Sequence, residues 1–157
     1  MYSEIIMDSL RLTTGSSEET EDLGFKIGTF LKTHGGAKTI CLFGELGAGK
    51  TTLIKGIASA FNISKRDIGS ASFVIVAEYE TSPPFYHIDL YRLEKDVDVE
   101  DTGIWEYIES DGISVIEWAE RLDEIPENAV TVRINLLGEE SREIIIEGID
   151  EKDWHNM

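Results

Sequence analysis

Apolar residues recur along the chain at two spacings, one typical of strands and one typical of helices. Residues 39–43 are a short, continuously apolar run, the pattern of a strand covered on both faces within a parallel sheet. Residues 50–61 instead repeat their apolar positions at helical spacing, and Asn62 closes that segment. A second helix is predicted to begin at Ser16, whose hydroxyl can cap the first turn, and to end near Gly35. Each helix is therefore expected to pack one apolar face against a sheet.

Seven further segments complete the predicted order of elements. Strands are expected at residues 5–13, 73–79, 85–90, 113–117, 129–136 and 142–147, and a helix at residues 101–110. Pro83 and Pro84 favour a turn that makes a hairpin of the two strands flanking them. The pattern predicts one α/β domain over residues 1–149, in three layers, with a mixed sheet that is parallel at its centre and antiparallel at its ends. Residues 150–157 are expected to be a polar C-terminal tail that frays.

A glycine-rich loop lies between the apolar strand at residues 39–43 and the helix that follows it. Residues 44–51 satisfy the pattern G-x-x-x-x-G-K-[ST] in the strand-to-helix context that a phosphate-binding loop requires. Glycines let backbone N–H groups point inward, and the helix N-terminus adds positive charge to this anion site. The fold prediction thus becomes a P-loop NTPase fold. The residues of this segment expected to bind nucleotide are Gly44, Gly47, Ala48, Gly49, Lys50, Thr51 and Thr52.

Acidic residues at strand ends are the second requirement of a P-loop enzyme, because an acid must hold Mg²⁺ or its water. Asp89 and Glu117 each follow an apolar strand, so both are candidates. Together with the Thr51 hydroxyl they are the expected metal ligands, and with Lys50 they are the expected catalytic residues. The division of roles between the two acids stays open. His87 shares a strand face with Asp89, but a histidine within a strand is more often a packing residue, so it is given no chemistry.

Other residues bear on the phosphates and on the nucleotide base. Ser72 lies where γ-phosphate sensing loops often occur, and Arg92 and Arg142 are the arginines best placed to meet phosphate charge. No arginine stands out as a transition-state contact, so slow hydrolysis is expected from the isolated chain. A guanine-recognition pattern, [NT]-K-x-D, is missing from the late strands. ATP is therefore the expected nucleotide, with ADP as its product.

The charge balance limits the partners. The chain has 14 Lys and Arg against 31 Asp and Glu, a formal charge of −17, and no cluster of basic residues that could hold nucleic acid. No apolar run approaches the roughly 20 residues of a membrane span, and the first residues do not resemble a signal peptide. Cys41 is the only cysteine, so no intrachain disulfide can form and a buried, inert thiol is expected. These features predict a cytoplasmic protein that binds neither membrane nor nucleic acid directly.

Three sequence blocks together resemble one protein family. They are residues 44–52 (GELGAGKTT), residues 87–92 (HIDLYR) and residues 116–118 (IEW), in that order. The chain resembles the TsaE family, formerly YjeE, whose members are small bacterial ATPases. That family acts with TsaD and TsaB to make threonylcarbamoyladenosine on tRNAs that read codons beginning with A. The resemblance implies a TsaD–TsaB complex as partner, and contact with tRNA only through that complex.

The resemblance also assigns site residues by position. The glycine-rich loop would cradle the phosphates, and Thr51 and Glu117 would bind Mg²⁺. Asp89 would lie beside the metal and the catalytic water. Ser17 would lie near the adenine, and Arg142 would approach the nucleotide.

One departure from the family pattern leaves alternatives open. Residues 70–73 read Ser-Ala-Ser-Phe where the family usually has Ser-Pro-Thr-Phe. Losing the proline ring should loosen this sensing loop and weaken the coupling between nucleotide state and partner docking. A nucleotide-dependent switch with negligible hydrolysis therefore remains an alternative. A small-molecule kinase is a second, although the arginines are scattered and no lid-like insertion is evident.

Overall fold

A seven-stranded mixed sheet forms the middle of the molecule in the computed structural model, which describes residues 9–45, 47–69 and 75–157. The strands are β1 (Ser9–Thr14), β2 (Thr39–Phe43), β3 (Val76–Tyr79), β4 (Phe85–Asp89), β5 (Ile113–Glu117), β6 (Val130–Leu136) and β7 (Arg142–Glu147). Their order across the sheet is β1-β7-β6-β2-β5-β4-β3. The four central strands, β6, β2, β5 and β4, are parallel, whereas β3 and the pair β7 and β1 add antiparallel ends. The predicted mixed sheet is confirmed, while residues 5–8 and 73–74 of two predicted strands lie outside the described part of the chain.

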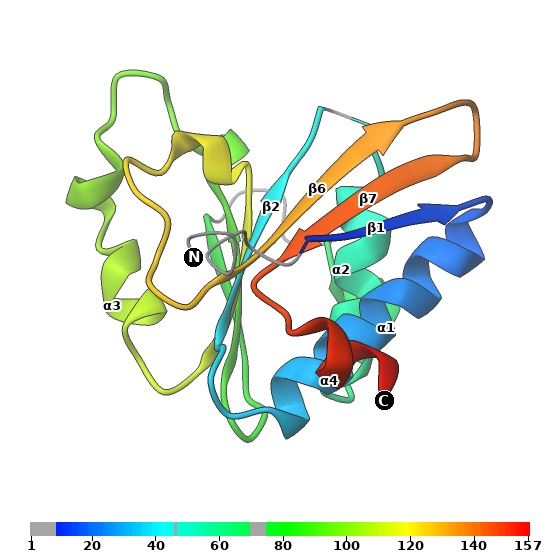
Figure 1. The fold of residues 1–157 in the computed structure, drawn as a ribbon. Helices are drawn as coiled ribbons and strands as arrows, with labels where there is room; N and C mark the ends of the chain where they lie inside the picture. Colours follow the sequence, from blue (N-terminus) through cyan, green and yellow to red (C-terminus); the bar gives the residue numbers. More distant parts are fainter. Residues whose placement is uncertain (1–8, 46, 70–74) are drawn as a thin grey trace, which may run out of the picture.

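Helices and short turns cover the sheet on both faces (Figure 1). The α-helices are α1 (Ser17–Thr33), α2 (Lys50–Ser59), α3 (Ile104–Ile108) and α4 (Glu151–His155), and the 3-10 turns are η2 (Lys65–Asp67), η3 (Leu90–Arg92), η4 (Val99–Thr102) and η5 (Ala119–Arg121). α1, α2 and the buried Trp154 of α4 share one hydrophobic cluster with residues from one face of the sheet. α3 and residues from η3, η4 and η5 form a second cluster on the other face. The three-layer prediction is confirmed as well.

Strand β2 shows why the central run is apolar throughout. Ile40 and Leu42 join the cluster beneath α1 and α2, while Cys41 between them joins the cluster on the opposite face. All three side chains are completely buried. Burial raises the pKa of the Cys41 thiol to about 12, so the thiol stays protonated and unreactive, as expected.

Two segments differ from the sequence-based expectation. The helix expected over residues 101–110 is divided into η4 and α3 by Gly103, whose φ of 78° lies in the left-handed region. The C-terminal tail does not fray: Asp150 caps α4 by accepting a hydrogen bond from the Lys152 backbone N–H. Trp154 anchors this helix with only 2% of its surface exposed, and the Lys26 ammonium lies 4.2 Å from the centre of its ring. The other residues of this helix are polar, so its composition does not reveal that Trp154 packs the helix against the rest of the protein.

In the described parts of the chain, no helix is both long and apolar enough to cross a bilayer.

Glycines bring α1 and α2 into unusually close contact. A Cβ atom on Gly24 would overlap the carbonyl oxygen of Leu53, and one on Gly56 would overlap the carbonyl oxygen of Glu21. At Gly28 the same atom would lie 2.6 Å from a backbone oxygen of α2. The two backbones therefore touch, and this contact fixes the position of α2, which begins at Lys50.

We expect Gly56→Ala to lower the free energy of unfolding by roughly 1–3 kcal/mol, because the added methyl must push two backbones apart. Urea denaturation of the purified protein measures this change. Gly35→Ala is the matched control, since a Cβ there meets no atom within 4 Å, and its effect should stay within about 0.5 kcal/mol. Equal stability of the two variants would refute the close-contact interpretation.

Candidate functional site

The glycine-rich loop connects the end of β2 to the start of α2, as its sequence context predicts. Gly47 and Gly49 have φ values of 80° and 107°, a left-handed conformation that costs other residues energy. Gly49 is the N-cap of α2, and among the described residues no side chain caps this helix end. Its first N–H groups therefore remain available for an anion, with the positive end of the helix dipole behind them. Residue 46 of the loop lies outside the described residues.

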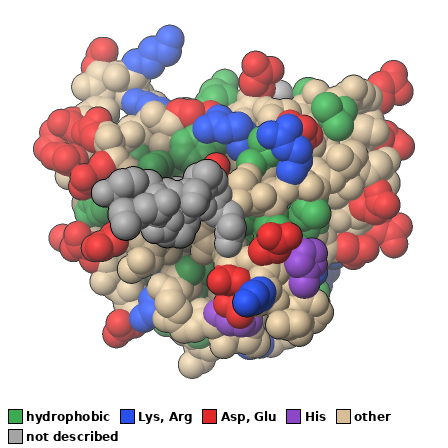
Figure 2. Space-filling model, in the orientation of Figure 1, with side chains coloured by type: hydrophobic (Ala, Val, Ile, Leu, Met, Phe, Trp, Pro, Cys, Tyr) green, Lys and Arg blue, Asp and Glu red, His purple; other side chains and the backbone are tan. Residues whose placement is uncertain are grey.

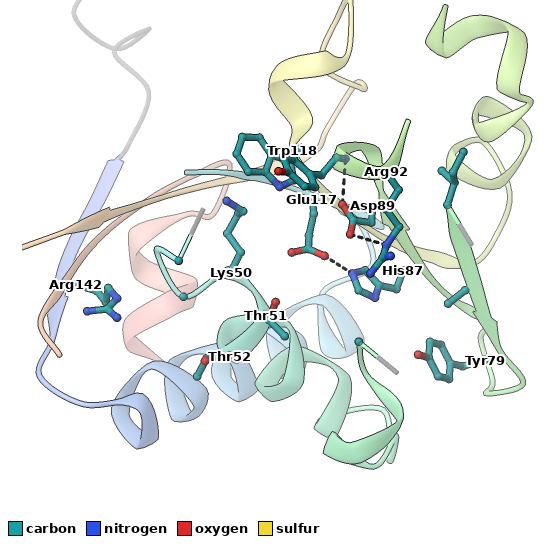
Figure 3. Close-up of a pocket in the computed structure, with 16 residues that line it drawn as sticks. Lys50, Thr51, Thr52, Tyr79, His87, Asp89, Arg92, Glu117, Trp118 and Arg142 are labelled. Atoms are coloured by element: carbon teal, nitrogen blue, oxygen red, sulfur yellow. Dashed lines mark hydrogen bonds and ion pairs between the residues drawn. The ribbon is translucent and has the colours of Figure 1, made fainter. Parts of the chain in front are cut away.

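A cavity of about 510 Å³ opens above this loop. Its lining combines the loop and start of α2 with the ends of β4 and β5 and with side chains from β3 and β7. The lining residues are Gly47, Gly49, Lys50, Thr51, Thr52, Gly69, Ile75, Ala77, Tyr79, His87, Asp89, Tyr91, Arg92, Glu117, Trp118 and Arg142. Figure 3 shows Lys50, Thr51, Asp89 and Glu117 gathered between Arg142 on one side and Tyr79 on the other. The candidates from three distant parts of the sequence thus meet at one place.

Lys50 lies buried at the wall of this cavity, with 5% of its surface exposed. Its ammonium donates hydrogen bonds to the carbonyl oxygens of Gly44 and Glu45, the latter at 2.9 Å. It also lies 4.1 Å from the centre of the Trp118 ring, within the range of a cation–π contact. Burial lowers the pKa of Lys50, and the negative charges of Glu120 and other acids offset part of that effect. An incoming phosphate would add the counter-charge that this buried ammonium favours.

Asp89 and Glu117 occupy corresponding positions on neighbouring parallel strands, where they are the last residues of β4 and β5. Burial raises the pKa of Asp89, and the like charge of Glu117 raises it further. A hydrogen bond from the Tyr91 backbone N–H (3.1 Å) and the positive charge of Arg92 act in the opposite direction. The two carboxylates lie on adjacent strand ends, and the raised pKa of Asp89 shows that its negative charge is unfavourable there. Such a site is suited to a cation.

His87 is the functional candidate that the sequence interpretation missed. It is buried and hydrogen-bonded, as expected of a packing residue, but its Nε2 atom lies 2.7 Å from Oε2 of Glu117 (Figure 3). The ring therefore fixes the orientation of a site carboxylate. The available signal was strand alternation, which places His87 on the face of Asp89, together with the parallel pairing of β4 and β5.

Trp118 and Tyr91 form an aromatic pair at the edge of the cavity. Their ring centres are 4.9 Å apart, and Tyr91 is 56% exposed. Trp118 adopts a φ of 58°, rare for a bulky residue, and its ring thereby meets the Lys50 ammonium. Backbone strain of this kind is concentrated at functional sites.

Arg142 reaches the loop from the opposite side of the cavity. Its Nε atom donates to the carbonyl of Ala48 at 2.8 Å, while Nη1 donates to carbonyls in the β6–β7 turn, including Ser141 at 3.1 Å. A second, much smaller cavity joins Arg142 to Ser17 at the start of α1. Arg142 therefore ties the turn to the phosphate-binding loop.

The remaining predicted residues divide into three groups. Gly44 and Ala48 support the loop from behind and are not among the described residues that line the 510 Å³ cavity. Thr52 lines both cavities. Ser72 falls within residues 70–74, outside the described part of the chain, as does the departure from the family pattern.

The chain is similar to known proteins over most of its length. A family model described as "Threonylcarbamoyl adenosine biosynthesis protein TsaE" matches residues 14–144. Proteins named tRNA threonylcarbamoyladenosine biosynthesis protein TsaE are similar over most of the chain. The one from Bacillus subtilis is 36% identical, covering 88% of this chain and 85% of its own length. The one from Aquifex aeolicus is 38% identical, with coverages of 93% and 96%.

A solved structure extends the similarity to three dimensions. The crystal structure of YdiB from Bacillus subtilis superposes with a TM-score of 0.71 at 29% sequence identity, covering 94% of this chain and 90% of that one. The family match spans the glycine-rich loop, both strand-end acids and Arg142. The chain belongs to the TsaE family.

Proposed function

We propose that this protein is the ATP-binding and ATP-hydrolysing subunit of tRNA threonylcarbamoyladenosine biosynthesis. The observation that carries the proposal is the cavity in which an uncapped helix N-terminus and Lys50 face the Asp89–Glu117 pair. Membership of the TsaE family supports the pathway, since its relatives carry that name. The tRNAs would be those that read codons beginning with A, and the place of action would be the cytoplasm.

The nucleotide has one orientation that suits the cavity. Its β- and γ-phosphates would lie on the backbone of residues 47–52, with Lys50 as the main cation. Because the acids lie on the β4 and β5 side, the γ-phosphate would point toward them. The base would then lie at the other end, where Arg142 and Ser17 line the smaller cavity.

Mg²⁺ fits the residues present. Among the described residues, no three His, Cys, Asp or Glu side chains are grouped closely enough to hold a metal alone. Mg²⁺ is commonly held by one or two carboxylates together with substrate phosphates, and the Thr51 hydroxyl and Glu117–Asp89 pair offer that set. The ion would neutralise charge on the phosphates during transfer to water.

The chain's own residues supply the rest of the chemistry. One of the two carboxylates would orient the attacking water, and His87 would hold Glu117 in place for either role. Arg92 lines the cavity but also pairs with Asp89, its Nε lying 3.1 Å from the carboxylate. Full transition-state stabilisation would therefore come from a partner, the TsaD–TsaB complex.

Surface charge favours indirect contact with tRNA. Figure 2 shows acidic side chains gathered at two sides of the displayed face, with Lys and Arg scattered between them. With a formal charge of −17, the chain lacks the cationic footprint of a nucleic-acid-binding protein. The partners would therefore hold the tRNA.

We expect the purified protein to hydrolyse ATP slowly alone and faster, by a factor of ten or more, with the TsaD–TsaB complex. A transition-state contact supplied in trans is worth up to about 10³–10⁵ in rate, which leaves ample room for that increase. Phosphate release measured with and without the complex tests this, and Lys50→Ala should abolish both rates because it removes the main phosphate cation.

Other results of this turnover assay would favour the switch or the kinase over an ATPase activated by its partners. Nucleotide binding without any rise in turnover would favour the switch. A phosphorylated metabolite formed at the expense of ATP would favour the kinase, and full turnover by the isolated chain would contradict partner activation.

We expect Asp89→Asn to stabilise the protein without ligand at neutral pH and to abolish its stabilisation by Mg²⁺. The pKa of Asp89 is raised in the folded state, so its ionised form lowers stability at pH values above that pKa. This loss should vanish as the pH falls well below 3.8, the ordinary pKa of an aspartate carboxyl, because the carboxyl is then protonated in both the folded and the unfolded state.

Thermal unfolding of the variant and the wild type across pH, with and without Mg²⁺, measures both effects. Asp96→Asn is the control, since Asp96 is exposed and outside the cavity. A variant less stable than the wild type at every pH would contradict the electrostatic interpretation.

A further inference from the structure

Arg121 connects the two segments that carry the site acids. It ends η5, four residues after Glu117, and its guanidinium donates hydrogen bonds to three backbone carbonyls of the turn that follows β4. The accepting oxygens belong to Leu90 (2.9 Å), Leu93 and Glu94 (3.0 Å). A single planar side chain thus joins the turn after Asp89 to the turn after Glu117.

This connection begins where the sheet stops. The ladder between β4 and β5 ends with the pair Asp89–Glu117, so the sheet fixes the backbones of the two acids. The direction of the Asp89 side chain depends on η3, since its carboxylate accepts hydrogen bonds from the Tyr91 N–H and the Arg92 Nε, both at 3.1 Å. Arg121 binds the first carbonyl of η3 and two that follow η3.

The same short turn also contacts the phosphate-binding loop. Glu120, beside Arg121, accepts a hydrogen bond from the Gly44 backbone N–H at 3.3 Å. Trp118, at the other end of the turn, contacts the Lys50 ammonium. Residues 118–121 therefore touch both the phosphate side and the acidic side of the cavity, and Arg121 supplies the contact to the acidic side.

We propose that Arg121 is a positioning residue for the metal side of the nucleotide site. By holding η3 against η5, it keeps the Asp89 carboxylate beside Glu117, where the two can share Mg²⁺. It acts through backbone carbonyls and is not among the described residues that line the cavity. The inference rests on the proposed function, in which Mg²⁺ accompanies the nucleotide.

The charge and shape of the side chain both matter for this role. A guanidinium presents several donors in one plane and can therefore bind carbonyls on successive residues, whereas an ammonium is a compact point charge. Lysine at this position would be expected to retain part of the contact. A methionine would keep most of the length and remove every donor.

The test compares nucleotide affinity with and without the metal. ADP binding is measured by calorimetry in EDTA and across a Mg²⁺ titration, for wild type, Arg121→Met, Arg121→Lys and the control Arg11→Gln. Arg11 is an exposed residue on edge strand β1, and its ion pair with Glu143 is of the weak surface kind. Unfolding curves check that each variant is folded.

In Arg121→Met, the Mg²⁺ concentration that gives half of its maximal effect on ADP affinity should rise roughly 10-fold to 100-fold. Losses of this size are usual when a residue that orients metal ligands is removed. ADP affinity in EDTA should stay within about twofold, because the phosphate-binding loop is unchanged. Arg121→Lys should show a smaller shift in the same direction, and it provides the test if the methionine variant does not fold.

Two results would overturn the inference: an equal loss of ADP affinity with and without Mg²⁺, or a Mg²⁺ midpoint unchanged in both variants. The first would mean that Arg121 only stabilises the fold. Failure of the proposed function appears separately, in the wild type, as ADP binding that does not respond to Mg²⁺ or is missing altogether.

Discussion

The site depends on the parallel pairing of β4, β5 and β2. Parallel strands end at the same edge of a sheet, so their C-terminal residues meet even though they are far apart in sequence. Here that edge brings together Asp89, Glu117 and the loop that begins at Gly44. Hydrophobic clusters on both faces hold the three strands in place, and the site side chains therefore stand on a rigid support.

The charged forms of Lys50 and Asp89 are both destabilised by their surroundings at this edge of the sheet. Burial lowers the pKa of Lys50, while burial and a neighbouring carboxylate raise that of Asp89. Both shifts show charges held in a place where they are less stable than in water. A phosphate would relieve the first and a cation would relieve the second, so Mg²⁺ and nucleotide are expected to favour each other's binding.

The sequence predicted the features that depend on local patterns. The glycine-rich loop, the apolar strands and the Ser16 cap each have a signal within a few residues, and the structure contains all of them. The role of His87 could not be read this way, because its partner Glu117 is 30 positions away and reaches it only through the strand pairing. Arg121 was missed for the same reason, since it binds carbonyls some 30 positions earlier in the chain.

Errors at the ends of elements have a different cause. The spacing of apolar residues predicts one helix over residues 101–110, but Gly103 interrupts it. The left-handed conformation of Gly103 cannot be recognised from that spacing. Trp154 docks a tail that composition alone describes as polar, because a single large side chain buries enough surface to hold one helical turn. Such contacts depend on what the rest of the fold places beside the residue, here Lys26 of α1.

An acidic protein that binds a polyanion must concentrate its positive charge. The cavity is lined by three of the chain's cationic side chains, Lys50, Arg92 and Arg142, and the N-terminus of α2 adds to them. The outer surface works against the approach of ATP, because long-range fields follow the net charge. Salt screens that repulsion over about 8–10 Å, whereas contacts inside a partly buried cavity are screened much less. Affinity for nucleotide is therefore decided at short range, by the same residues whose positions the strand ends fix.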